Sequence, residues 1–251
     1  MTLFFISDLH LSPRTPGATR IFTDFLAASA RPGAALYVLG DFFEAWAGDD
    51  AASFSPYREI FTALRRARAA GLALFFQHGN RDFLLGKSFT AATGATLLPD
   101  PYVLSTAKWQ FVLSHGDRLC TDDTAYQNFR ALTRSAPWQH DFLARSLEER
   151  LQLAEKLRAQ SEVEKRDKPY AQTDLNPAAT DDFLRACGYA TFIHGHTHRP
   201  ARHDHLVDGI HVERWVLADW SETRGEALVW DEKTLCRRVL PASDREVVHN
   251  P

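Results

Sequence analysis

The stretch LFFISDLHLS, residues 3–12, joins an apolar run to a short polar cluster. Residues 3–6 are all large and apolar, which is typical of a buried strand. Directly after this run come Asp8 and His10, whose side chains can each bind a metal ion. In an extended chain, residues two apart point to the same side, so Asp8 and His10 could face one ion unless the loop geometry changes this.

Four further polar clusters follow along the chain, most of them after an apolar run. They are Gly40-Asp41, Gly79-Asn80-Arg81-Asp82, Ser114-His115-Gly116-Asp117 and Gly195-His196-Thr197-His198. Their glycines let the backbone turn sharply or approach an ion closely. Singly, each cluster is explained as well by a capped turn or a hydrogen-bonded core histidine. Together and in this order, the five clusters predict a metal site at the carboxyl ends of the strands of an open α/β sheet.

The segments between these strands carry apolar residues at helical spacing. Residues 21–30 and 57–70 predict helices, and Asn176-Pro177 opens another that ends near Gly188. Strands that alternate with helices predict an α/β layered core. Residues 210–217, 227–230 and 234–240 predict antiparallel strands, which we expect to complete a second sheet packed on the first.

Residues 121–168 depart from this alternation. Apolar residues recur three or four positions apart, which predicts two or more amphipathic helices. Their place between the fourth and fifth clusters favours a lid over the polar site, although ordinary core helices show the same pattern. We therefore expect a single domain over residues 1–251 with a helical lid insertion at about 121–170.

Composition excludes several classes of protein. A formal net charge of -3, from 29 basic and 32 acidic residues, gives no general attraction to nucleic acid or anionic lipid. Cys120, Cys187 and Cys236 are odd in number and widely spaced, which argues against disulfides or a thiolate zinc site and fits a reducing cytosol. No stretch approaches the ~20 apolar residues of a membrane-spanning helix. Any attachment to a membrane is expected to be peripheral.

The donor types predict an open, catalytic metal centre. Carboxylate, imidazole and amide side chains without cysteine suit Mn²⁺, Fe²⁺ or Zn²⁺, with manganese favoured. His78 and His194 lie beside the clusters and are alternative ligands. A core or hydrogen-bonding role is the better interpretation for both, because the Gly-His-x-His spacing selects His196 and His198.

In order, the clusters resemble the calcineurin-like metallophosphoesterase superfamily, whose pattern is Asp-x-His, Gly-Asp, Gly-Asn-His/Arg-Asp, His and Gly-His-x-His. The longer strings FFISDLHLS, LYVLGDFFEAWAGDD, FFQHGNRDFLLG, LSHGDRLCTDD and FIHGHTHRP are similar to the bacterial diphosphatases that act on UDP-2,3-diacylglucosamine in lipid A synthesis. Arg81 is the informative detail, since many superfamily phosphatases have histidine there. The resemblance covers nearly the whole chain and implies a four-layer αββα sandwich of two mixed sheets with a helical lid insertion.

The resemblance also implies roles for matching residues. Asp8, His10 and His198 would hold one metal ion, Asn80, His115 and His196 the other, and Asp41 would bridge them. The implied cofactor is a pair of Mn²⁺ ions. The residues implied in catalysis are Asp41, Asn80, Arg81 and His115. Those implied in substrate binding are Asn80, Arg81, Asp123, Ser161, Lys165, Lys168 and His196.

The implied reaction is hydrolysis of the pyrophosphate bond of UDP-2,3-diacylglucosamine, with metal-activated water attacking the α-phosphorus. It releases UMP and 2,3-diacylglucosamine 1-phosphate. The acylated nucleotide-sugar substrate implies peripheral attachment to the cytoplasmic face of the inner membrane, with no nucleic-acid or obligate protein partner expected. Two alternatives stay open. A broader phosphodiesterase or nucleotide phosphatase would share the ligands and differ in the lid, whereas a non-catalytic scaffold of the same fold is disfavoured by the intact ligand set.

Overall fold

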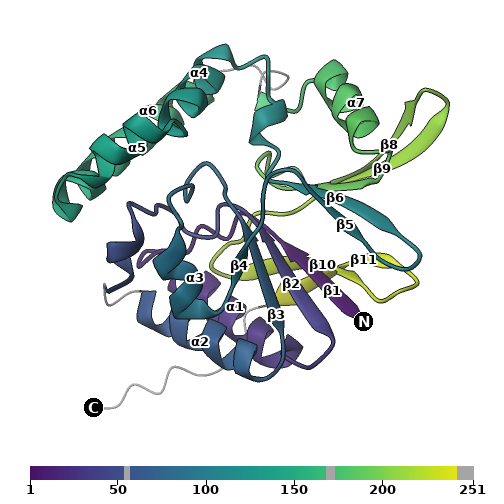
Figure 1. The fold of residues 1–251 in the computed structure, drawn as a ribbon, viewed down its shortest axis with the longest axis horizontal. Helices are drawn as coiled ribbons and strands as arrows, with labels where there is room; N and C mark the ends of the chain where they lie inside the picture. The colour runs from purple at the N-terminus through teal and green to yellow at the C-terminus, as the bar shows by residue number, and fades with distance from the viewer. Residues whose placement is uncertain (54–56, 168–172, 242–251) are drawn as a thin grey trace.

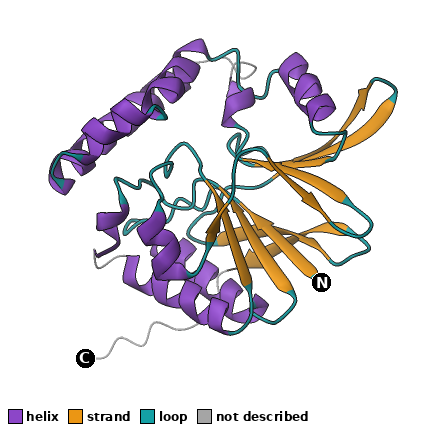
Figure 2. Cartoon of the chain, in the orientation of Figure 1, coloured by secondary structure: helices purple, strands orange, loops and turns teal. Residues whose placement is uncertain are grey.

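Two mixed β-sheets lie face to face at the centre of the molecule, with helices outside them (Figures 1 and 2). The computed structural model describes residues 1–53, 57–167 and 173–241. Side chains from both sheets fill the space between them, including Phe5 and Tyr37 from the first and Phe111 and Ile193 from the second. With helices on both outer faces, this is the four-layer αββα sandwich that the resemblance implied.

The first sheet is built around three parallel strands. It contains β1 (Thr2–Ile6), β2 (Ala34–Leu39), β3 (Ala73–Gln77), β4 (Thr96–Leu97), β10 (Arg224–Trp230) and β11 (Leu235–Pro241), in the order β11-β10-β1-β2-β3-β4. In the parallel register, Ile6 lies opposite Val38 and Val38 lies opposite Phe76. The ends of β1, β2 and β3 are therefore level, and the loops that follow them meet at one edge.

The second sheet brings two further strand ends to the same side. It contains β5 (Tyr102–Ser105), β6 (Gln110–Ser114), β7 (Thr191–His194), β8 (Ala201–Val207) and β9 (Ile210–Val216), in the order β5-β6-β7-β9-β8. Strands β6 and β7 are parallel, with Ser114 opposite His194. The polar clusters after these two strands are adjacent for that reason.

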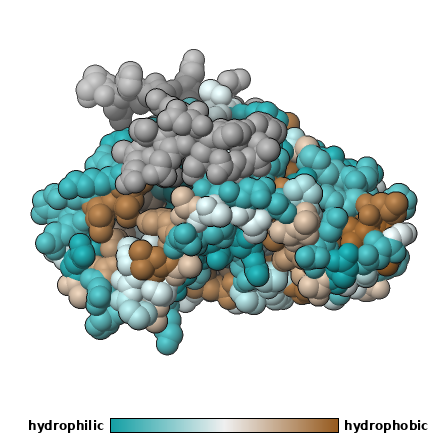
Figure 3. Space-filling view, turned by 90° about the horizontal axis from the view of Figure 1, so that it is seen from above, coloured by the Kyte–Doolittle hydropathy of each residue, from teal (hydrophilic) through white to brown (hydrophobic). Residues whose placement is uncertain are grey.

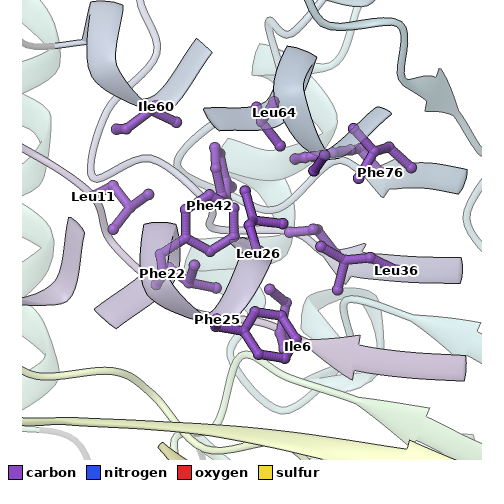
Figure 4. Packing of buried hydrophobic residues seen from close by; sticks show 14 of the residues in the cluster. Ile6, Leu11, Phe22, Phe25, Leu26, Leu36, Phe42, Ile60, Leu64 and Phe76 are labelled. Carbon is purple, nitrogen blue, oxygen red and sulfur yellow. The ribbon is translucent and has the colours of Figure 1, made fainter. Parts of the chain in front are cut away.

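Helices cover the outer face of each sheet. On the first sheet lie α1 (Pro16–Ser29), α2 (Arg58–Ala69) and α3 (Lys87–Thr93). Phe22 of α1 and Leu64 of α2 pack in one apolar cluster with Leu36 and Phe76 of the sheet (Figure 4). The second sheet is covered by α7 (Pro177–Ala186), in the helical segment that the sequence predicted. Its cap forms as expected, because the side chain of Asn176 accepts a hydrogen bond from the backbone of Ala179 at 3.0 Å.

Three helices occupy the predicted insertion and lie over the strand ends (Figure 1). They are α4 (Thr124–Thr133), α5 (Ala136–Leu143) and α6 (Leu147–Asp167), and we call them the lid. Arg150 of α6 anchors the lid to the core. Its side chain is 3% exposed and donates to Oδ1 of Asp50 at 2.9 Å and to the carbonyl of Ala47.

The surface seen from above is mostly hydrophilic, with apolar side chains in separate patches (Figure 3). On the lid, Leu132 and Leu143 are exposed by 55% and 44%. Among the described residues, no helix is long and apolar enough to cross a membrane.

The expected position of the last strands was wrong in part. Strands β10 and β11 do not join the second sheet; β10 pairs antiparallel with β1, with Leu3 opposite Trp230, and β11 pairs with β10. Of the three predicted segments, β9 alone lies in the second sheet. After β9 the chain returns to the first sheet, and the backbone N–H of Trp220 donates to the carbonyl of Asp8 at 3.0 Å.

Candidate metal centre and substrate cleft

The loops after five strands bring together all seven side chains that the sequence proposed as metal ligands. Asp8 and His10 follow β1, Asp41 follows β2, Asn80 follows β3, His115 follows β6, and His196 and His198 follow β7. The level ends of the parallel strands in each sheet explain why residues so far apart in the chain converge.

Asp8, His10 and His198 form the first group. Nε2 of His198 lies 3.2 Å from Oδ1 of Asp8 and 3.3 Å from Nε2 of His10. One donor atom from each residue lies within 4.8 Å of the others, so the three atoms are close enough to share a single ion.

Asn80, His115 and His196 form the second group. Oδ1 of Asn80 lies 3.0 Å from Nε2 of His115 and 2.9 Å from Nδ1 of His196. The carbonyl oxygen of the amide is thus the common neighbour of two imidazoles, one from each of two parallel strands of the second sheet.

Asp41 adjoins both groups. Its Oδ1 lies 3.7 Å from Nε2 of His115, and Asp8, Asp41 and His115 make a further set of donor atoms within 4.8 Å of one another. The same Oδ1 accepts a hydrogen bond from the backbone N–H of Arg81 at 2.8 Å. Asp41 therefore occupies the position that a bridging ligand requires, with Asp8 beside it.

Five of these seven residues have left-handed backbones. The φ angles of Asp8, His10, Asp41, His196 and His198 are 56°, 49°, 50°, 68° and 55°. Few non-glycine residues adopt such angles, and they cluster at functional sites that hold them by other contacts. Here the backbone N–H of His10 donates to the carbonyl of Asp41 at 3.0 Å, and that of His196 to Oδ2 of Asp8 at 2.9 Å. Asp8 and His10 thus lie in a loop, because β1 ends at Ile6, and strand alternation does not place them. Their side chains nevertheless fall in one donor group, as the sequence predicted.

The electrostatics of the cluster fit divalent cations. Asp8 and Asp41 are almost completely buried, at 0% and 2% exposed, although their like charges lie close together. Burial alone would raise the pKa of Asp8, but the hydrogen bond and charge of His198 hold it below its usual range. Burial raises the pKa of Asp41 to about 6. Two buried carboxylates among imidazole and amide donors form the environment that a bound divalent ion neutralises.

Two histidines of the cluster, His10 and His115, differ in their pKa values. Burial lowers the pKa of His10 to about 3. Burial acts in the same direction on His115, but the charges of Asp41 and Asp8 outweigh it and raise the pKa of His115 to about 9. A cation that binds at His115 therefore competes with a proton.

A cavity of about 610 Å³ opens between this cluster and the lid. Its polar side is formed by residues of the cluster and their neighbours, including Asn80, Arg81, His196 and His198. Its apolar side comes mainly from the lid and consists of Phe83, Phe129, Trp138, Phe142, Ala154 and Leu157. A second hollow of about 680 Å³, between α1 and α2, contains none of the predicted site residues. The cluster and the lid thus face each other across one cleft.

The predicted substrate-binding residues are only partly placed. Asn80, Arg81, Asp123 and His196 line the cleft. Asp123 also caps α4, because its Oδ1 accepts from the backbone of Tyr126 at 3.1 Å. Ser161 and Lys165 belong to α6, in a part whose side chains the structure does not describe, and Lys168 lies outside the described residues. Thr173 and Arg199 line the cleft without having been predicted.

The sequence prediction missed Glu44, which lies between the first group and the lid. Its carboxylate is 3.4 Å from Nδ1 of His10, 3.5 Å from Nη1 of Arg81 and 2.6 Å from Nε of Arg158 in α6. A carboxylate behind a metal-binding histidine fixes the orientation of the ring and raises its basicity. Glu44 lies three residues after Asp41, but no motif marks it.

His78 and His194 take the core roles that the sequence favoured. Nδ1 of His194 is 2.8 Å from the carbonyl of Gly195, and its Nε2 is 3.1 Å from Nη1 of Arg214. Nε2 of His78 lies 2.7 Å from the carbonyl of Leu85. Both imidazoles are thus hydrogen-bonded to protein groups next to the cluster.

Residues 1–200 match the family model of the calcineurin-like phosphoesterases. The chain is also similar to curated proteins named UDP-2,3-diacylglucosamine hydrolase. The one from Aromatoleum aromaticum is 49% identical over 92% of this chain and 94% of its own length. Those from Chromohalobacter salexigens and Chromobacterium violaceum are 48% and 47% identical, over 90% and 92% of this chain and 91% and 96% of their own. This chain therefore belongs to the calcineurin-like phosphoesterase family.

Proposed function

We propose that this protein is a UDP-2,3-diacylglucosamine hydrolase that cleaves the pyrophosphate bond of its substrate with two Mn²⁺ ions. The products are UMP and 2,3-diacylglucosamine 1-phosphate. The observation that carries the proposal is the cleft, in which a cluster of seven metal donors faces an apolar lid. A diphosphate matches the polar side, and acyl chains match the apolar side. The names of relatives that match over nearly their whole length support the same substrate.

The chain offers a ligand set for each ion. Asp8, His10 and His198 would hold one ion, and Asn80, His115 and His196 would hold the other. Asp41 lies beside both groups and would serve as their shared ligand. When bound, two such ions lower the pKa of water at the site and neutralise charge that develops on the phosphoryl oxygens.

Arg81 positions the diphosphate. Arg81 lines the cleft with a side chain that is only 16% exposed, and its Nη1 lies 3.5 Å from the carboxylate of Glu44. A guanidinium restrained in this way donates charge-assisted hydrogen bonds to phosphoryl oxygens with little loss of entropy. Its backbone N–H holds Asp41, so one residue connects phosphate binding to the bridging carboxylate.

The lid selects the acylated substrate. Trp138 and Phe142 stack with ring centroids 4.8 Å apart, and Phe83 lies 6.1 Å from Trp138. Each methylene group that moves from water onto such a surface contributes about 0.8 kcal/mol. A nucleotide sugar without acyl chains gains nothing from this side of the cleft.

The protein binds peripherally to the cytoplasmic face of the inner membrane. A diacylated substrate resides in the bilayer, and the lid that receives its chains also exposes Leu132 and Leu143. Exposed apolar side chains on the helices of the lid favour contact with the membrane interface. Co-sedimentation with vesicles that contain anionic lipid tests this, and loss of co-sedimentation in Leu132→Ser/Leu143→Ser is the expected result.

The function is tested by comparing UDP-2,3-diacylglucosamine with unacylated UDP-glucosamine, following UMP release in the presence of Mn²⁺. We expect kcat/KM to be at least about 100-fold higher for the acylated substrate, since burial of a few methylene groups suffices for that ratio. Asp41→Ala should abolish turnover, whereas Asp204→Ala, at a carboxylate on β8, should not. Equal rates on the two substrates indicate a broader phosphodiesterase, and undiminished turnover by Asp41→Ala contradicts the bridging role.

A further inference from the structure

Asp117 connects the lid to the core. It lies two residues after His115 and is completely buried. Its Oδ2 accepts hydrogen bonds from three side chains of the lid: the hydroxyl of Tyr126 at 2.7 Å, Nε of Arg130 at 2.7 Å and Nη2 of Arg134 at 3.5 Å. The first two donors belong to α4, and Arg134 is its C-terminal cap. We call these four residues the latch.

The latch also reaches the second group of metal ligands. Nη2 of Arg134 donates to the carbonyl of Gly79 at 2.9 Å, which is the peptide group that precedes Asn80. The ring of Tyr126 stacks on His196, with centroids 5.8 Å apart and planes at 29°. Asp117 itself is separated from His115 only by Gly116. Each ligand of the second group is therefore adjacent to the latch, through the backbone or through a ring contact.

The first group is supported from a different direction. His10 is held by Glu44, which pairs with Arg158 of α6. Asp8 is held by the backbone of His196 and the side chain of His198. The lid side chain nearest the first group is thus Arg158, which belongs to α6 and not to the latch.

We propose that Asp117, Tyr126, Arg130 and Arg134 are positioning residues that hold Asn80, His115 and His196 in their metal-binding arrangement only while α4 is docked. The affinity for the second ion then depends on the lid. Because coupling between two equilibria is reciprocal, binding of that ion also stabilises the docked state of α4. The proposal rests on the metal centre of the proposed function.

Arg134 is the residue of the latch to substitute, because it joins Asp117 to the backbone beside Asn80. Its loss should therefore affect the metal ligands directly and not only the packing of the lid. The test measures Mn²⁺ dissociation constants by calorimetry in two backgrounds. His10→Ala leaves the second group intact, and His115→Ala leaves the first group intact. Outer contacts of metal ligands typically contribute about 10- to 100-fold in affinity. Arg134→Leu should therefore weaken Mn²⁺ binding at least about tenfold in the His10→Ala background, and less than about threefold in the His115→Ala background.

Arg150→Leu is the matched control, because it removes an arginine of the lid that joins α6, rather than α4, to the core. Its partners, Asp50 and the carbonyl of Ala47, are not among the proposed ligands. It should change neither dissociation constant. Arg134→Lys, which keeps the charge and can make one of the two hydrogen bonds, should restore part of the affinity. In the unmutated protein, Mn²⁺ should also slow hydrogen exchange of the backbone amides of α4, and Arg134→Leu should lose that protection.

Equal weakening in the two backgrounds, or the same loss in Arg150→Leu, would show general loosening of the lid and overturn the latch. An unmutated protein that binds two Mn²⁺ ions, with Arg134→Leu unchanged in both backgrounds, overturns the latch alone. An unmutated protein that binds no Mn²⁺ overturns the metal centre and the latch together. If Arg134→Leu does not fold, Tyr126→Phe is used, because it deletes only the hydroxyl bound to Asp117. One lost hydrogen bond should then weaken Mn²⁺ binding about threefold in the His10→Ala background only. An unchanged Mn²⁺ affinity in that background would overturn the latch.

Discussion

A methyl group at Gly195 would test whether backbone proximity fixes a metal ligand. A Cβ at this position would overlap the side chain of Ser7 and Oδ2 of Asp8. That same Oδ2 accepts the hydrogen bond from the backbone of His196, so the methyl group intrudes where loops from the two sheets are joined. Neither neighbour has room to withdraw, because Ser7 and Asp8 are both completely buried and the hydroxyl of Ser7 donates to the carbonyl of Leu39.

The expected magnitude follows from this crowding. Gly195 does not have a positive φ, so the backbone conformation itself would tolerate alanine. An extra methyl group in a packed interior costs about 1–3 kcal/mol of stability. To make room, the carboxylate of Asp8 must move by about 1 Å, and displacements of that size cost about 100-fold in rate. We therefore expect Gly195→Ala to lower kcat/KM about 100-fold at saturating Mn²⁺ and to weaken Mn²⁺ binding.

Gly209→Ala is the control for lost stability. Its φ is +81° and no atom lies within 4 Å of a Cβ there, so alanine should cost about 1–2 kcal/mol through its left-handed backbone alone. Urea unfolding and steady-state kinetics on both variants separate the two effects. If folded Gly195→Ala keeps kcat/KM within about threefold of the unmutated protein, or if Gly209→Ala loses as much activity, the packing argument for Asp8 is refuted.

Three further predictions concern the outer contacts, the core and the lid. Glu44→Gln keeps the shape of the side chain but removes the charge beside His10, so Mn²⁺ affinity measured by calorimetry should fall about tenfold. An unchanged affinity would contradict the role of Glu44 in orienting His10. Burial raises the pKa of Tyr37 to about 12, so its contribution to stability is present below pH 10 and is lost as pH rises toward 12. Over this range, the free energy of unfolding measured with urea should fall less for Tyr37→Phe than for the unmutated protein, by up to about 1.4 kcal/mol per pH unit. Parallel curves for the two proteins would refute this prediction. Trp138→Ala should lower kcat/KM about tenfold or more on the acylated substrate alone, since burying a side chain of this size contributes at least ~1.4 kcal/mol. As a control, Trp109 lies outside the cleft and is 47% exposed, so Trp109→Ala should change kcat/KM on neither substrate.

The ligand cluster could be predicted because it depends on short-range sequence. Each ligand follows a strand within a few residues, and the ends of parallel strands meet at one edge of a sheet. Asp8, Asn80 and His196 therefore converge without any knowledge of side-chain packing. The left-handed angle of Asp8 was not predictable in the same way, since it depends on contacts with β2 and with the loop after β7.

Sheet membership and outer contacts depend on distant partners. The apolar pattern of β10 indicates a strand but does not say that Leu3 lies opposite Trp230 rather than a residue of the second sheet. Strand β8 alternates exposed and half-buried polar residues at the edge of its sheet, so it has no apolar face to detect. Glu44 and Arg134 act through neighbours that are 34 and 55 positions away, such as His10 and Gly79, and no local motif records such contacts.

The lid contacts the two halves of the cluster through different residues. Arg158 of α6 reaches His10 through Glu44, and Arg134 reaches the peptide group before Asn80. A substitution in these helices can therefore weaken metal binding or acyl-chain binding. Either defect lowers the measured rate, so the rate alone does not distinguish them. The two effects separate when Mn²⁺ is varied, because saturating metal restores a variant whose only defect is weaker metal binding and leaves the loss of an apolar contact unchanged. On that reasoning, Trp138→Ala should stay impaired at high Mn²⁺ while Arg134→Leu recovers, and persistent impairment of both variants would assign the lid to substrate binding alone.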